Sequence, residues 1–152
     1  MAVFEDQVIL SCPPEPLFDF LLRPANVQRI SDPSMGLTIV NAPEIVEPGS
    51  ELEIQLMTFG QVVKAKQKIT DVSRPHTIIE EQIQGPLPKW RHEHHFESHS
   101  NGVLMRDVIE FELPGGILGM LLKEETIIGQ LEDGFQHRQR QLSQLISQGE
   151  IG

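Results

Sequence analysis

The pattern of apolar and polar positions changes its period along the chain, and each period predicts a type of element. Apolar and polar residues alternate in Phe4 to Ser11, which predicts a strand that ends at Cys12-Pro13-Pro14. Pro16 to Leu22 has the spacing of a short amphipathic helix, and Asn26 to Ile30 fits a second one. The chain is therefore expected to begin with one strand and two short helices.

Six further segments have the two-residue period of strands. They are Leu37 to Asn41, Glu51 to Phe59, Val62 to Val72, Thr77 to Gln84, Trp90 to Glu97 and Val103 to Phe111. Turns are predicted at Gly60-Gln61 and at residues 99–102, where Ser, Asn and Gly gather. Short turns between consecutive strands favour an antiparallel meander.

Lys123 to Gln148 is the one long stretch with helical spacing. Its apolar stripe consists of Ile127, Ile128, Leu131, Phe135, Leu142, Leu145 and Ile146, and Arg138 falls on the same stripe. Gly129 and Gly134 each cost about 1 kcal/mol in a helix interior, so close packing or a bend is expected there. The predicted fold class is α+β: one domain over residues 1–152, with a curved antiparallel sheet of about seven strands wrapped on this helix.

The strand from Trp90 to Glu97 has two unlike faces, because successive side chains of a strand point to opposite sides. One face is aromatic with two imidazoles at its centre, and it consists of Trp90, His92, His94 and Phe96. The other face is charged, and it consists of Arg91, Glu93, His95 and Glu97. The first face is the predicted floor of a pocket.

The turn at residues 99–102 sets the register between this strand and Val103 to Phe111. With Ser98 opposite Val103, the apolar faces of the two strands coincide, as a correct register requires. The inward pairs are then Phe96 with Met105, His94 with Asp107, His92 with Ile109, and Trp90 with Phe111. His94 and Asp107 would lie roughly 5 Å apart at Cβ. Glu81, on the preceding strand, is a candidate partner for His92.

Composition and charge exclude several classes of function. The 152 residues carry 22 acidic and 12 basic side chains, a formal charge of −10, which disfavours binding to nucleic acid or anionic membranes. No apolar run approaches the roughly 20 residues that span a bilayer, so stable membrane insertion is not expected. A single cysteine, Cys12, excludes an intrachain disulfide, and the acidic start at Glu5 and Asp6 does not resemble a signal peptide. The expected location is the cytoplasm.

The order of elements resembles the helix-grip fold of the START and birch-pollen-allergen superfamily, also called SRPBCC. Four motifs carry the resemblance to a bacterial ligand-binding or cyclase/dehydrase-like branch: residues 81–87, 90–96, 107–114 and 135–138. The resemblance implies a small hydrophobic or lipid-like ligand held between the sheet and the last helix. The chain departs from the family at Leu87 and His137, where an aromatic residue and a tyrosine are common. It has no tyrosine, which excludes a pocket tyrosine as an acid.

The main hypothesis is a binding module without cofactor or metal. Its predicted ligand contacts are the apolar Trp90, Phe96, Met105, Phe111, Leu131 and Phe135 and the polar His92, His94, Asp107 and Arg138. A second hypothesis is a cyclase/dehydrase-like enzyme in which His94 is the general base and Asp107 orients it. A third is a co-chaperone-like interaction domain that uses the outer sheet face or the apolar stretch Leu113–Leu122.

The same residues also allow other interpretations, several of them purely structural. The inward polar residues could simply hydrogen-bond to one another, or the two histidines could bind a metal with Glu81 or Asp107 as third ligand. Arg138 either binds an anion inside the fold or extends its charged end to water. The stretch Leu113–Leu122 is either a packed connection or a lid over the cavity mouth. Ligand identity and oligomeric state are not predicted.

Overall fold

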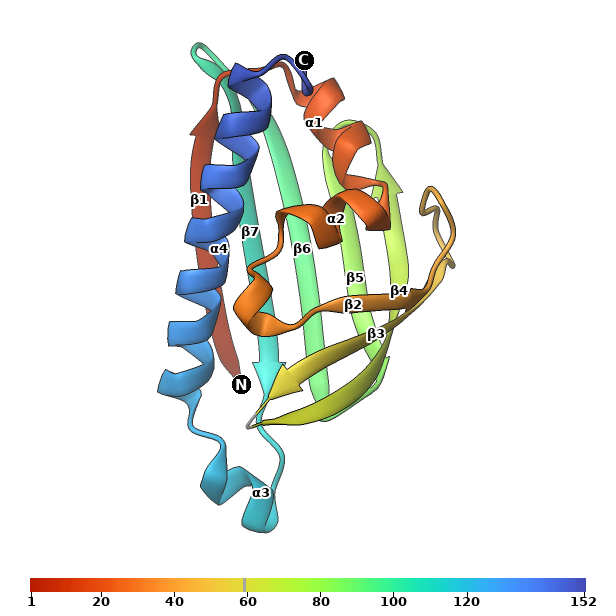
Figure 1. Ribbon diagram of the computed structural model, residues 1–152, viewed down its shortest axis with the longest axis vertical. Coiled ribbons are helices and arrows are strands. Elements are labelled where there is room, and N and C mark those ends of the chain that lie inside the picture. The colour runs from red at the N-terminus through yellow and green to blue at the C-terminus, as the bar shows by residue number, and fades with distance from the viewer. Residues whose placement is uncertain (59) are drawn as a thin grey trace.

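The computed structural model shows a strongly curved sheet with one long helix along it (Figure 1). It describes residues 1–58 and 60–152. The strands are β1 (Ala2–Leu10), β2 (Thr38–Asn41), β3 (Glu51–Thr58), β4 (Gln61–Ser73), β5 (Thr77–Gln84), β6 (Lys89–His99) and β7 (Gly102–Glu112). The helices are α1 (Pro14–Leu21), α2 (Pro24–Ile30), the 3₁₀ turn η1 (Pro33–Met35), α3 (Gly116–Leu121) and α4 (Glu124–Ser147).

The sheet is antiparallel, with the strand order β1-β7-β6-β5-β4-β3-β2. Helices α1 and α2 carry the chain away from β1 before β2 begins, which leaves the edge of β1 free to pair with β7. Bulges between Lys66 and Gln67 and between Ile69 and Asp71 interrupt the pairing of β4 with β5, and bulges bend strands. The predicted helix-grip class, including the two short helices, is confirmed. In the described part of the chain, no helix is both long and apolar enough to cross a bilayer.

Prolines explain where the short helices start. Helices α1 and α2 begin at Pro14 and Pro24, because a proline in the first turn loses no helical hydrogen bond. Helix α4 begins with Glu124 and Glu125, whose negative charges suit the N-terminal end of a helix dipole. The predicted strand that ended at Phe59 is observed to Thr58, and Phe59 lies outside the described residues.

The predicted register between β6 and β7 is confirmed for every inward pair. Phe96 lies opposite Met105, His94 opposite Asp107, His92 opposite Ile109, and Trp90 opposite Phe111. The turn is shorter than predicted, because His99 and Gly102 already pair. Gly102 has a φ of +135°, and a Cβ there would lie 2.0 Å from the carbonyl oxygen of Leu10. The close approach of β1 therefore requires glycine at this turn.

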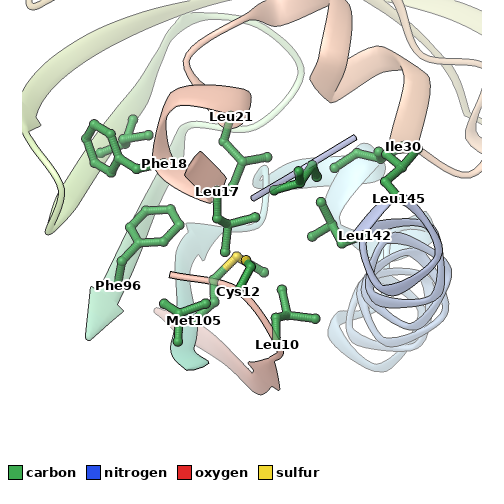
Figure 2. Packing of buried hydrophobic residues seen from close by; sticks show 13 residues of the cluster. Leu10, Cys12, Leu17, Phe18, Leu21, Ile30, Phe96, Met105, Leu142 and Leu145 are labelled. Atoms are coloured by element: carbon green, nitrogen blue, oxygen red, sulfur yellow. The ribbon is translucent and has the colours of Figure 1, made fainter. Parts of the chain in front are cut away.

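The larger apolar core lies at the end of the molecule where α1 meets the C-terminal half of α4 (Figure 2). We call it the upper cluster, as oriented in Figure 1. Its buried members are Leu10, Cys12, Leu17, Phe18, Leu21, Ile30, Ile78, Phe96, Val103, Met105, Leu142, Leu145 and Ile151. The rings of Phe18 and Phe96 meet edge to face with centroids 5.3 Å apart. Helix α1 thus closes this end of the sheet.

A second core, the lower cluster, lies under the N-terminal half of α4. Its buried members are Ala2, Phe4, Ile109, Phe111, Leu131 and Phe135. Five further side chains are only partly buried against it: Leu87, Trp90, Leu113, Ile127 and Ile128. Partly buried residues are five of the eleven in the lower cluster and six of the nineteen in the upper cluster, so the lower cluster is the less completely covered of the two.

The stretch from Leu113 to Leu122 contains the short helix α3, which extends away from the sheet in Figure 1. Ile117, Met120 and Leu121 are 79%, 78% and 70% exposed. For these three side chains the expectation of a packed connection is wrong. An apolar, solvent-exposed helix instead joins the end of β7 to the start of α4.

Candidate functional site

A row of polar side chains crosses the face of the sheet beneath α4, between the upper and lower clusters. We call it the polar stripe, and it consists of Asp6, Glu80, His92, His94 and Asp107. Strand pairing sets the row: Asp6 lies opposite Asp107, Asp107 opposite His94, and Glu80 opposite His92. Four adjacent strands thus bring together residues that are distant in the sequence.

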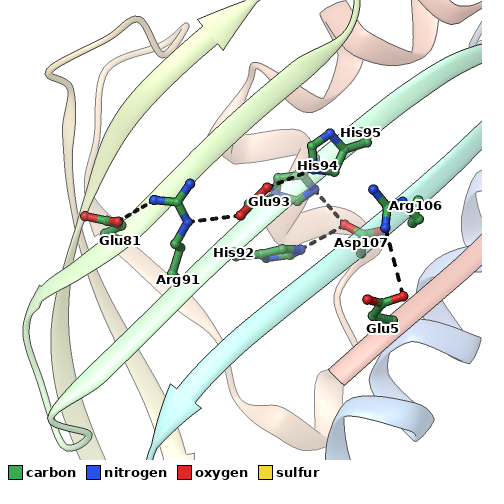
Figure 3. Close-up of polar contacts among 9 residues, drawn as sticks. All are labelled: Glu5, Glu81, Arg91, His92, Glu93, His94, His95, Arg106 and Asp107. Atoms are coloured by element: carbon green, nitrogen blue, oxygen red, sulfur yellow. Dashed lines mark hydrogen bonds and ion pairs between the residues drawn. The ribbon is translucent and has the colours of Figure 1, made fainter. Parts of the chain in front are cut away.

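Asp107 is the most deeply buried member of the stripe, at 1% exposure. Its Oδ1 lies 2.8 Å from His92 Nε2, in hydrogen-bonding geometry (Figure 3). His94 Nδ1 is also 2.8 Å from Oδ1, yet among the described residues it has no well-aligned hydrogen-bond partner, and neither has Asp107 Oδ2. The predicted contact of His94 with Asp107 is present, but the hydrogen bond comes from His92, the diagonal neighbour across the strands.

Glu80, and not Glu81, is the acid that approaches His92. Glu80 Oε1 lies 3.4 Å from His92 Nδ1. Glu81 accepts a 2.8 Å hydrogen bond from Arg91 on the outer face of the sheet (Figure 3). The prediction that Glu81 reaches His92 is therefore wrong. The sequence of β5 has two isoleucines followed by two glutamates, and β4 has a bulge after Ile69. The two-residue period therefore does not determine which glutamate faces inward.

The two imidazoles are stacked, and Phe135 of α4 packs against one of them. The ring centroids of His92 and His94 are 3.8 Å apart, with 32° between the ring planes. Phe135 of α4 meets His92 edge to face at 5.8 Å. The Arg138 guanidinium lies over the Phe135 ring, 5.0 Å from its centroid, a cation–π distance.

The stripe distributes charge unevenly between its two histidines. Burial lowers the pKa of His92, but the hydrogen bond to Asp107 and the negative charges of Asp107 and Glu80 outweigh it, so the pKa is raised. Burial and the charge of His92 lower the pKa of His94. Burial opposes the ionisation of Asp107 and Glu80, yet their histidine contacts hold both pKa values below the usual range. The favoured state is a His92 cation between two carboxylates, beside a neutral His94.

Helix α4 adds a polar residue that sequence reasoning did not single out. Gln139 donates a hydrogen bond to Asp6. Burial raises the pKa of Asp6, and the charge of Asp107 raises it further. Asp6 could have been found from the sequence, because it shares the two-residue period with Phe4 and Val8. Gln139 offered no such signal, since helix rotation depends on packing.

The structure divides the predicted apolar contacts into two groups. Trp90, Phe111, Leu131 and Phe135 belong to the lower cluster. Phe96 and Met105 lie on the other side of the stripe, in the upper cluster, where each is 1% exposed. The first group is packed through aromatic rings, with the centroids of Trp90 and Phe111 5.9 Å apart.

The described surface includes two hollows. One, of about 290 Å³, lies where β1 begins and β7 ends, and is lined by Met1, Ala2, Phe111, Glu112, Leu113 and Glu124. The other, of about 530 Å³, lies between α2 and β2, and its lining includes Arg23, Ile39 and Val40. Of these two, only the first shares a residue, Phe111, with the predicted site.

Comparison with solved structures supports the fold. The chain is similar to protein NE0264 from Nitrosomonas europaea at 14% identity and a TM-score of 0.71, over 97% of this chain and 96% of that one. It is similar to Ara h 8.0201 at 16% identity and a TM-score of 0.64 (93% and 97% covered). TTHA0849 from Thermus thermophilus gives 13% identity and a TM-score of 0.68 (97% and 99% covered). Similarity at this level shows the helix-grip fold alone.

The comparisons do not test the resemblance to the ligand-binding or cyclase/dehydrase-like branch. No protein-family model matches the chain, and no curated protein matches it. The ligand-binding or cyclase/dehydrase-like branch therefore stays a prediction, and function has to be argued from the site.

Proposed function

We propose that this protein binds a small, largely apolar molecule with one polar end, between the sheet and the N-terminal half of α4. The observation that carries the proposal is the hollow of about 290 Å³ beside Phe111 and Leu113. It opens next to the lower cluster, which is the incompletely covered half of the core. Ligand pockets in proteins begin at about 300 Å³, so the volume of the hollow suits a small molecule or the entrance for a longer one. Its lining combines the apolar Met1, Ala2, Phe111 and Leu113 with the carboxylates of Glu112 and Glu124.

The polar stripe supplies a polar inner end to this apolar region. His94 Nδ1 and Asp107 Oδ2 are buried and have no well-aligned hydrogen-bond partner among the described residues. Leaving such a group unpaired costs about 1–3 kcal/mol, which a hydrogen bond to a ligand would offset. The segment of β7 from Asp107 to Phe111 spans about 13 Å. A ligand that reaches from the hollow to the stripe is therefore long and narrow.

Helix α3 supports entry at this end of the molecule. It connects Leu113 to Glu124, and both residues line the hollow. Its exposed side chains, Ile117, Met120 and Leu121, present apolar surface on the segment between these two lining residues. Such a surface favours the arrival of a lipid-like molecule from a larger apolar phase.

The experiment has two parts, release of bound material and binding of a fluorescent probe. Purified protein is denatured, and extracted small molecules are identified by mass spectrometry. The emptied protein is then titrated with 1-anilinonaphthalene-8-sulfonate, an apolar probe with an anionic end. Trp90 is the sole tryptophan in the sequence, so energy transfer from tryptophan to the probe reports binding near the lower cluster.

Matched glutamate substitutions locate the probe. Leu113→Glu places a negative charge in the first hollow, and Val40→Glu places the same charge in the second. Because like charges repel, we expect Leu113→Glu to raise the probe concentration needed for half-maximal energy transfer at least tenfold, roughly 1.4 kcal/mol, and Val40→Glu to leave it unchanged. The reverse pattern, or no binding together with no extracted molecule, refutes the proposal.

A further inference from the structure

We propose that Glu80, His92 and His94 form a binding site for one divalent transition-metal ion, with Zn²⁺ as the reference ion. One carboxylate oxygen and one nitrogen from each imidazole lie within 4.8 Å of one another. His92 is buried and its two partners are half-buried. This proposal does not depend on small-molecule binding.

The distance between two of these atoms fits coordination better than a hydrogen bond. Zn–N and Zn–O bonds of about 2.0–2.1 Å at tetrahedral angles place two ligand atoms about 3.3–3.4 Å apart. Glu80 Oε1 and His92 Nδ1 are 3.4 Å apart, beyond the usual N–H···O range of about 2.7–3.2 Å. A metal ion between them requires little change in their separation.

The scaffold holds the three side chains on paired strands. His92 and His94 are alternate residues on one face of β6, and Glu80 is the direct partner of His92 on β5. The stacked rings, 3.8 Å apart between centroids, place the edges of both imidazoles on the same side of the sheet. Two imidazoles and one carboxylate are a common ligand set for Zn²⁺.

Asp107 has the position of a residue that orients a metal ligand. It accepts the hydrogen bond of His92 Nε2 at 2.8 Å, which leaves Nδ1 of the same ring directed at Glu80. A histidine that donates its second nitrogen to a carboxylate is the usual arrangement around protein-bound zinc. Asp107 is thus assigned as a positioning residue.

The charge balance of the stripe also favours a cation. A metal ion on His92 Nδ1 takes the place of the proton that makes His92 a cation. Asp6, Glu80 and Asp107 are then three acids in one row of the sheet, with Arg138 as a nearby basic side chain. A divalent ion would offset the remaining negative charge. Three protein ligands leave one coordination position open. On the proposed function, that position would accept the polar end of an oxygen-bearing ligand.

Metal binding is tested on the full chain after treatment with a chelator. Co²⁺ is added first, because its visible absorption reports four-coordinate binding, and Zn²⁺ is then titrated in competition. We expect one ion per chain. Glu80→Gln and His94→Ala should each weaken metal binding at least about tenfold. Mutating a residue that only hydrogen-bonds to a metal ligand already produces a loss of that size.

The chain offers matched controls on the opposite face of the sheet. Glu81→Gln and His95→Ala change the neighbouring residues, whose contacts are with Arg91 and Glu93, and should leave the affinity within about twofold. Imidazole NMR of the unsubstituted chain tests the site without altering the fold: Zn²⁺ should shift the signals of His92 and His94 and leave His95 and His99 unchanged. Absence of stoichiometric binding, equal losses in the control variants, or shifts confined to the outer histidines would overturn the proposal.

Discussion

Replacing Asp107 with asparagine tests whether the polar stripe stabilises the fold as a buried ion pair. The side chains of Asp107 and His92 are only 1% and 6% exposed. Removing one partner of a buried pair costs about 3–5 kcal/mol when the other charge stays buried without compensation. Here Glu80 remains 3.4 Å from His92 and compensates part of its charge. Asparagine keeps the size of the side chain and can still accept a hydrogen bond, so we expect the lower end of that range, about 3 kcal/mol. That is a large share of the roughly 5–15 kcal/mol that stabilises a domain.

Glu93→Gln is the matched control on the outer face of β6. Like Asp107, Glu93 has two basic neighbours: its Oε1 lies 2.9 Å from His95 Nε2, and its Oε2 accepts a 3.1 Å hydrogen bond from Arg91 Nε. It also loses one carboxylate charge on substitution. Its side chain is 22% exposed and that of His95 is 27% exposed. Solvent-accessible pairs of this kind contribute about 0.2–1 kcal/mol. The difference between the two variants therefore measures the effect of burial on a similar contact.

Urea unfolding of chelator-treated protein near pH 6 measures both variants. Unfolding is followed by circular dichroism and by the fluorescence of Trp90, and the midpoint is interpreted only where the slope is unchanged. Asp107→Asn should lower the free energy of unfolding by about 3 kcal/mol and Glu93→Gln by less than about 1 kcal/mol. An Asp107→Asn protein as stable as the unsubstituted chain, or equal losses in both variants, would refute the reasoning.

Three further predictions concern the rest of the molecule. Leu142→Ala, in the upper cluster, should cost about 2–5 kcal/mol in urea unfolding, and a cost under about 1 kcal/mol would contradict its complete burial. Gly129→Ala should stabilise the chain by about 1 kcal/mol, since an added Cβ meets no described atom within 4 Å; destabilisation would reveal a packing role. Hydrogen bonds from Arg74 lower the pKa of Asp19, so ionised Asp19 stabilises the fold above its unfolded pKa, and the effect is lost as pH falls through the folded pKa. Asp19→Asn should therefore lower the melting temperature at neutral pH, and a difference undiminished below about pH 4 would contradict this.

The register of β6 and β7 was predictable because two independent signals agree. The faces of the two strands coincide in this register, whereas a slip of one residue would separate them. The Ser-Asn-Gly turn then selects which residues pair. Backbone pairing followed directly, including His94 opposite Asp107. The hydrogen bond itself did not follow, because a rotation of each side chain decides between the direct and the diagonal partner.

The inward acid of β5 was not predictable from the pattern. Its sequence has two isoleucines followed by two glutamates, so both faces receive one of each, and the two-residue period cannot choose between Glu80 and Glu81. A bulge in the neighbouring strand β4 then sets the facing through long-range pairing. The candidate metal ligand Glu80 emerges only from the assembled sheet.

The surroundings of the two glycines in α4 could also not be predicted from the sequence pattern. The prediction of close packing holds at Gly134, where an added Cβ would lie 3.2 Å from Met35 Sδ. At Gly129 there is space around an added Cβ within the described structure, so close packing is not the reason for that glycine, and the alternative of a bend stays a prediction. A helix pattern gives the cost of a glycine but not what faces it, because that depends on elements distant in sequence, such as η1.

The proposed site is tested most directly by methyl NMR of the full chain during titration with 1-anilinonaphthalene-8-sulfonate. The account predicts that the signals of Leu113, Ile127 and Ile128, around the partly buried edge of the lower cluster, shift as the probe binds. The signals of Leu142 and Leu145, in the closed upper cluster, should stay in place. Shifts centred on the upper cluster, or on Val40 in the second hollow, would contradict small-molecule binding beneath the N-terminal half of α4.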